Sequence, residues 1–166
     1  MFNFNLSVKI YRSIVLMIAV FFTAAFSYGQ TFVLKSITSP KGNQIATIET
    51  MLDEPEIFDL SAKDIEKIRK LQSCVIKLKD TDEGLEILSC NISNFPIRGG
   101  MVFYEDSEKE DHFLYRNDDG DIMFDITLKT TFGYYRGFTL GIYKDEAFWW
   151  FNKDIKKQGA FLFERK

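Results

Sequence analysis

The chain has 166 residues, a formal net charge of −3, two cysteines and one histidine. This length allows one domain, or one domain and a targeting segment. An apolar fraction of 46% and an aromatic fraction of 16% exclude a disordered or collagen-like chain. The mild acidity gives no electrostatic footprint for nucleic acid, and two cysteines are too few for a disulfide framework or a four-cysteine zinc site.

The N-terminal segment has the three parts of a secretory signal peptide. Lys9 and Arg12 are its only charges, an apolar run follows over residues 14–22, and small residues lead to Gly29. A retained membrane anchor is the alternative. A spanning helix needs about 20 apolar residues, however, and this run soon becomes small and polar.

These features predict a secreted or periplasmic protein that has no stable membrane insertion after cleavage. We expect cleavage between Gly29 and Gln30, with cleavage after Ser27 as the second choice. The domain organisation that follows is a signal peptide over residues 1–29 and a single β-rich domain over residues 30–166.

The first half of this domain predicts two strands and a helix. Residues 31–38 alternate in polarity before a turn cluster, and residues 45–52 are rich in β-branched side chains, which favours a second strand. Ser61 is typical of a helix cap, with Asp64 in the first turn. Apolar residues at helical spacing up to Leu71 then indicate an amphipathic helix of about three turns.

The second half predicts a series of hairpins. Residues 122–128 and 134–142 carry apolar side chains at alternate positions, and a three-residue loop over 131–133 would set Ile126 opposite Phe138. Further hairpins would set Leu114 opposite Phe124 and Leu140 opposite Trp150, and short strands are expected over 100–104, 112–116 and 160–164.

The predicted fold class is therefore mainly β, with α+β possible. We expect an antiparallel β-meander that forms a half-barrel or barrel-like sheet with one amphipathic helix.

Cys74 and Cys90 flank a hairpin, and in an exported protein they invite a disulfide. One register sets them directly opposite each other. A second register, shifted by one residue, sets Ile76 opposite Ile87 and sends the two sulfurs to opposite faces. We expect the disulfide, with two small buried thiols as the alternative.

One face of three predicted adjacent strands combines glycines with aromatic side chains. Three glycines on a strand face indicate that something approaches closely. One interpretation is a pocket with aromatic walls and Asp125 as a polar anchor. The other is a curved sheet whose aromatic residues form a second small core. The candidate ligand-binding residues are Asp125, Tyr135, Tyr143, Trp149 and Phe151.

No pattern typical of an active site, metal site or cofactor site is found. His112 has no serine or cysteine partner at a recognisable spacing, and in a strand beside acids it is interpreted as a tolerated polar residue. Acidic clusters over 105–111 and 118–121 lack the spacing of an EF-hand and are expected to be solvated loops.

Our first functional hypothesis is an exported, non-enzymatic binding protein that holds a small apolar or aromatic-stacking ligand on the glycine and aromatic face. The alternative is a protein-interaction module, of the inhibitor or immunity type, whose acidic loops meet a basic partner. A hydrolase is the third hypothesis. No cofactor and no metal are expected.

Overall fold

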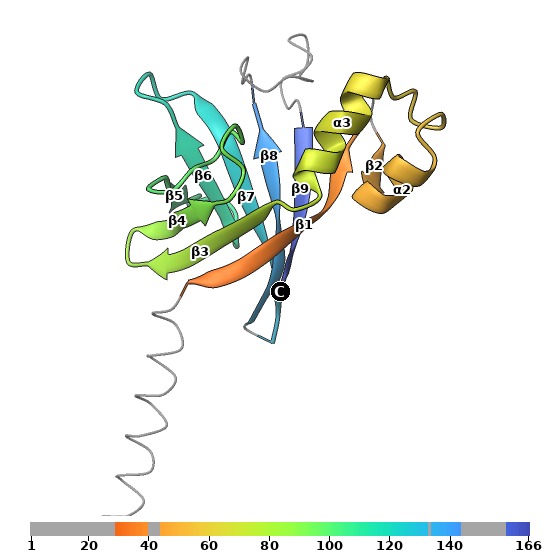
Figure 1. The fold of residues 1–166 in the computed structure, drawn as a ribbon. Coiled ribbons are helices and arrows are strands. Elements are labelled where there is room, and N and C mark those ends of the chain that lie inside the picture. The colour runs from red at the N-terminus through yellow and green to blue at the C-terminus, as the bar shows by residue number, and fades with distance from the viewer. Residues whose placement is uncertain (1–28, 40–43, 133, 144–158) are drawn as a thin grey trace, which may run out of the picture.

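The computed structural model describes residues 29–39, 44–132, 134–143 and 159–166. It shows a closed barrel of eight antiparallel strands, with one additional strand and two short helices at one end (Figure 1). The sheet order is β2-β1-β3-β4-β5-β6-β7-β8-β9, and pairing of β1 with β9 closes the barrel. The predicted fold class is confirmed.

The strands and helices follow the chain in a simple order. The elements are β1 (Gln30–Thr38), β2 (Ile45–Thr47), α2 (Ile48–Asp53), α3 (Ala62–Leu71), β3 (Val75–Thr81), β4 (Gly84–Cys90), β5 (Val102–Glu105), β6 (His112–Arg116), β7 (Ile122–Thr131), β8 (Tyr134–Ile142) and β9 (Gly159–Arg165).

Helix α3 confirms the predicted helix. The Ser61 hydroxyl accepts a hydrogen bond from the Asp64 amide, and the Asp64 carboxylate accepts one from the Ser61 amide, which completes a capping box. Ile68 and Leu71 are buried.

Among the described residues, no helix is both long enough and apolar enough to cross a bilayer.

The predicted strand over residues 45–52 is wrong beyond Thr47. The Thr47 hydroxyl accepts a hydrogen bond from the Thr50 amide and so caps α2. Ile48 and Met51 then lie one turn apart and are both buried. The cap and this burial outweigh the strand preference of the β-branched residues.

The β7–β8 hairpin was predicted on the correct face but in the wrong register. Leu128 lies opposite Phe138 and Ile126 opposite Leu140, two residues away from the predicted pairing. A two-residue turn, in place of the predicted three-residue loop, accounts for one residue of this offset, and a register shift between Lys129 and Thr130 accounts for the other. Because side chains alternate with a period of two, the apolar residues still face the interior.

The β6–β7 pairing differs from the prediction by one residue, and this changes the outer surface. Tyr115 lies opposite Phe124 and Leu114 opposite Asp125, with a register shift between Tyr115 and Arg116. A one-residue slip exchanges the two faces of a strand. Consequently His112 shares the outer face with Asp125, whereas the predicted register would have turned it toward the interior.

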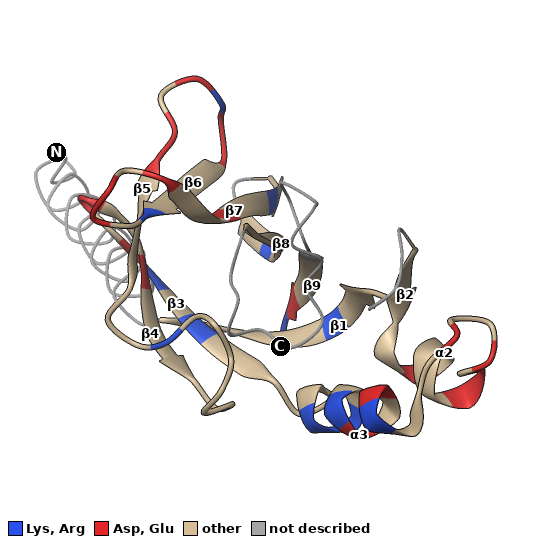
Figure 2. Ribbon diagram, turned by 90° about the horizontal axis from the view of Figure 1, so that it is seen from above, with Lys and Arg blue, Asp and Glu red and all other residues tan. Residues whose placement is uncertain are grey.

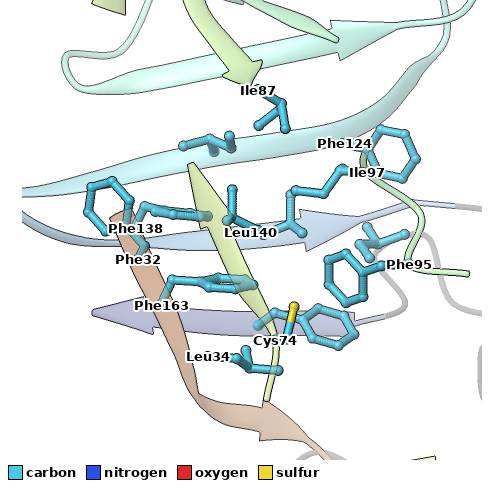
Figure 3. Packing of buried hydrophobic residues seen from close by; sticks show 14 of the residues in the cluster. Phe32, Leu34, Cys74, Ile87, Phe95, Ile97, Phe124, Phe138, Leu140 and Phe163 are labelled. Atoms are coloured by element: carbon cyan, nitrogen blue, oxygen red, sulfur yellow. The ribbon is translucent and has the colours of Figure 1, made fainter. Parts of the chain in front are cut away.

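Side chains pack the barrel interior (Figure 3). The rings of Phe138 and Phe163 stack with centroids 4.6 Å apart, and Phe32 meets Phe138 edge-on at 5.1 Å. These three residues come from β8, β9 and β1, so their rings join the strands at which the barrel closes.

The expected disulfide is not formed, because Cys74 and Cys90 are both free thiols. Neither predicted register is observed, since Ile76 lies opposite Cys90. The cysteines are thus diagonal neighbours, which places their α-carbons at about 7–8 Å, beyond the usual span of a disulfide. The Cys90 thiol and burial together raise the pKa of Cys74.

Candidate functional site

The outer face of β6 and β7 carries a chain of hydrogen-bonded polar side chains. The Nδ1 atom of His112 lies 2.9 Å from the Oδ2 atom of Asp106, and its Nε2 atom lies 3.2 Å from the Oδ2 atom of Asp125. The side chain of Asp125 is only 6% exposed and that of His112 is 11% exposed. This His112 cluster consists of Asp106, His112, Asp125 and Tyr143.

Strand pairing and a short loop position the two carboxylates and the imidazole of the cluster. His112 lies opposite Thr127 on β7, so Asp125 is its diagonal neighbour on the same face. The loop between β5 and β6 returns Asp106 to the ring, because the Asp106 amide donates to the His112 carbonyl at 2.8 Å. The amide of Glu108 and the ring of His112, in that order, lower the pKa of Asp106.

The chemistry of the imidazole follows from its two partners. A protonated ring donates to both carboxylates, whereas a neutral ring has one N–H and can donate to only one of them. Because carboxylates engage both nitrogens of His112, the contacts favour a positioning role over that of a general base. The ring links the β5–β6 loop to β7.

Tyr143 extends the cluster from the end of β8. Its amide donates to the carbonyl of Met123 at 2.8 Å, which fixes it beside the start of β7. Its hydroxyl donates to the Oδ2 atom of Asp125 at 3.3 Å. Burial and the negative charge of Asp125 raise the pKa of Tyr143 to about 12, because both oppose formation of the phenolate.

We expect the phenol of Tyr143 to titrate near pH 12, and the Asp125→Asn variant to bring its pKa closer to the ordinary value of about 10. The folded pKa is raised, so the stability that this phenol contributes is complete below about pH 10 and is lost as the pH rises toward 12. The measurement is an ultraviolet titration in which the Tyr143→Phe curve is subtracted. An unchanged titration in Asp125→Asn would show that the contact does not exist in solution.

The cluster lines a hollow of about 1000 Å³ on the outer face of the barrel. Leu114, Ile122 and Met123 give this hollow an apolar wall. Among its described lining residues, Lys109 and Arg116 are the only lysine or arginine, and carboxylates outnumber them. The acidic lining residues are Asp106, Glu108, Glu110, Asp121 and Asp125.

The structure brings together only part of the predicted ligand-binding set. Asp125 and Tyr143 are in contact and both line the hollow. Tyr135 lies eight residues before Tyr143 on β8, about 26 Å along an extended strand, and its hydroxyl donates to Asp80 of β3 at 2.8 Å. Trp149 and Phe151 lie outside the described residues.

The glycine at the middle of this face has a structural explanation. A Cβ atom on Gly137 would lie 2.3 Å from the carbonyl oxygen of Phe163. The close approach at this position is therefore that of the β9 backbone. This observation supports the curved-sheet interpretation for Gly137.

His112 and Asp106 are the site residues that sequence reasoning missed. The signal that could have identified His112 is the pairing of β6 with β7, because only the observed register places His112 and Asp125 on the same face. A bulge that shifts the register by one residue leaves little trace in the polarity pattern. In the described part of the chain, no three His, Cys, Asp or Glu side chains gather closely enough to hold a metal ion.

No protein-family model, curated protein or solved structure matches this chain.

Proposed function

We propose that this protein is an exported binding protein that holds a small ligand in the outer hollow beside the His112 cluster. The observation that carries the proposal is Asp125, whose side chain is 6% exposed and lies in the lining of an otherwise partly apolar hollow. Hydrogen bonds from His112 and Tyr143 hold its position. A concave surface with an apolar wall and a few oriented polar groups is the usual form of a small-molecule site.

The charge of the lining indicates the class of ligand. Five acidic side chains face Lys109, Arg116 and His112, so the hollow has a surplus of negative charge. A ligand with a flat apolar body and one ammonium group would place its body against Leu114 and Met123 and its charge near Asp125. Complementary charge of this kind fixes the orientation of the ligand.

Calorimetry with a matched pair of probes tests this function. We expect naphthylmethylammonium to bind, and neutral naphthylmethanol to bind about tenfold more weakly, because charge-assisted hydrogen bonds are roughly twice as strong as neutral ones. Asp125→Asn should weaken the binding of the cation by a similar factor. Asp53→Asn is the control, because Asp53 is an exposed acid on α2, outside the lining of the hollow.

Equal binding of the two probes, or an Asp125→Asn variant that binds the cation as the wild type does, would refute the proposal. Native mass spectrometry of the exported protein then identifies a ligand that it carries.

A protein-interaction module remains the second candidate. The loop between β5 and β6 projects from the barrel (Figure 2), and its Glu108 and Glu110 are exposed. A basic partner would meet this loop at the rim of the hollow. Charge reversal of Glu108 and Glu110 would then abolish capture of the partner at low salt.

A further inference from the structure

We propose that protonation of His112 opposes the binding of a cationic ligand in the outer hollow, so that the protein takes up such a ligand at neutral pH and releases it in acid. The inference rests on the proposed function, because it concerns the regulation of the same hollow. Its basis is geometric: His112 lies between Asp106 and Asp125, and all three residues line the hollow.

The imidazole lies where its charge acts directly on both carboxylates. Its Nδ1 atom is 2.9 Å from Asp106 and its Nε2 atom is 3.2 Å from Asp125, and the three side chains have little exposed surface. Water and salt therefore screen these contacts less than they screen a surface pair. A protonated ring donates to both carboxylates, whereas a neutral ring has one N–H and leaves one of them without a hydrogen bond from the ring.

The ligand and the proton compete for the same negative charge. The Oδ2 atom of Asp125 accepts hydrogen bonds from the Tyr143 hydroxyl and, when the ring donates, from His112. An ammonium group placed near Asp125 is repelled by a protonated His112 and is attracted more strongly when the ring is neutral. Because linkage is reciprocal, a bound cation also favours loss of the proton from the ring.

The backbone of the β5–β6 loop does not depend on the ring. The Asp106 amide donates to the His112 carbonyl at 2.8 Å, and the Glu108 amide donates to the Asp106 carboxylate at 3.1 Å. Neither contact involves the imidazole. The loop therefore keeps these two contacts when the ring loses its proton, and the expected effect of pH is one of charge.

His112 is the only histidine of the chain, and imidazole is the side chain that ordinarily changes its charge between about pH 5 and about pH 8. The Glu108 amide and then His112 lower the pKa of Asp106, so this acid stays ionised. Burial raises the pKa of Tyr143 to about 12, so the phenol stays neutral.

The other charged groups around the ring are carboxylates, a lysine and an arginine, types whose reference pKa values lie outside this interval. They are Glu108, Lys109 and Glu110 of the β5–β6 loop, Asp111 next to His112 in sequence, Arg116 of β6, Asp121 before β7 and Asp125 of β7. Protonation of His112 therefore reduces the negative surplus of the lining by one charge.

Calorimetry at two pH values tests the inference with the probes used above. We expect naphthylmethylammonium to bind about tenfold more tightly at about pH 8 than at about pH 5, a coupling of ordinary size between two sites. Naphthylmethanol has no charge, so its affinity should be the same at both pH values. His112→Gln should bind the cation equally at both, because an amide does not titrate.

Nuclear magnetic resonance of the wild type gives a test that needs no variant. Because the chain has one histidine, its imidazole signals report on His112 directly in protein prepared without a histidine tag. At about pH 6.5, where a reference imidazole is half protonated, saturation with the cation should move these signals toward the neutral ring. Naphthylmethanol should not move them in that direction.

The outcomes separate this inference from the proposed function. Failure of the cation to bind at either pH would refute both. Binding of the cation with equal affinity at the two pH values would refute the inference alone, as would an equal response of naphthylmethanol to pH. A His112→Gln variant that keeps the pH dependence of the wild type would assign it to another group and would also overturn the inference.

Discussion

Replacing Phe138 with alanine is expected to lower the free energy of unfolding by about 3–5 kcal/mol, the usual cost of truncating a buried phenylalanine. Phe138 has no exposed surface, stacks on Phe163 of β9 and meets Phe32 of β1 edge-on. The alanine variant would leave a cavity at the closure of the barrel. Urea unfolding followed by circular dichroism measures the loss.

A matched control is available on the same hairpin. Phe132→Ala removes an equal ring from a side chain that is 94% exposed, and it should change the free energy of unfolding by less than about 0.5 kcal/mol. Phe138→Leu, which preserves much of the volume, should fall between the two alanine variants. Similar losses for Phe138→Ala and Phe132→Ala would mean that Phe138 does not belong to the core.

The second large effect is expected at His112. Replacing it with alanine removes the group that lies between Asp106 and Asp125, and Asp125 is 4% exposed. Removal of the hydrogen-bond partner of a buried carboxylate usually costs about 1–3 kcal/mol, and more where that group is charged, because the carboxylate is left without the group that satisfied it. We expect His112→Ala to lower the free energy of unfolding by about 3 kcal/mol in urea at neutral pH.

A double variant distinguishes lost charge compensation from lost packing. If the charge of Asp125 causes the destabilisation, Asp125→Asn should restore part of the stability of His112→Ala. If packing causes it, the effects of the two substitutions should add. A loss of less than about 1 kcal/mol for His112→Ala would show that the cluster behaves as a surface ion pair and contributes little to the free energy of unfolding.

Local elements of the fold could be predicted because their causes are local. The capping residues Ser61 and Asp64 determine where α3 begins, and an alternating polarity pattern identifies β8 almost residue by residue. The exception is α2, because Thr47 ends β2 and also caps the helix, so residues 48–52 are helical although their polarity pattern resembles a strand. Capping and strand propensity compete at that position, and burial of the following residues decides the outcome.

The candidate site could be predicted only in part, because it depends on pairing between strands. Asp125 and Tyr143 were predicted from the face that they share. His112 was not, because the shift between Tyr115 and Arg116 moves its strand by one residue relative to β7. A slip of that size exchanges inner and outer faces and converts an isolated histidine into the centre of a hydrogen-bonded cluster.

The sequence by itself determined the class of the protein: an apolar N-terminal segment, a mainly β fold, an aromatic excess and a mild negative charge. These properties depend on composition and on periods of two or four residues. Closure of the barrel by β1 and β9, the separation of Cys74 and Cys90, and the His112 cluster were decided only by the tertiary structure. Each of these features depends on the register in which two strands pair. The local polarity pattern does not determine that register to better than one or two residues.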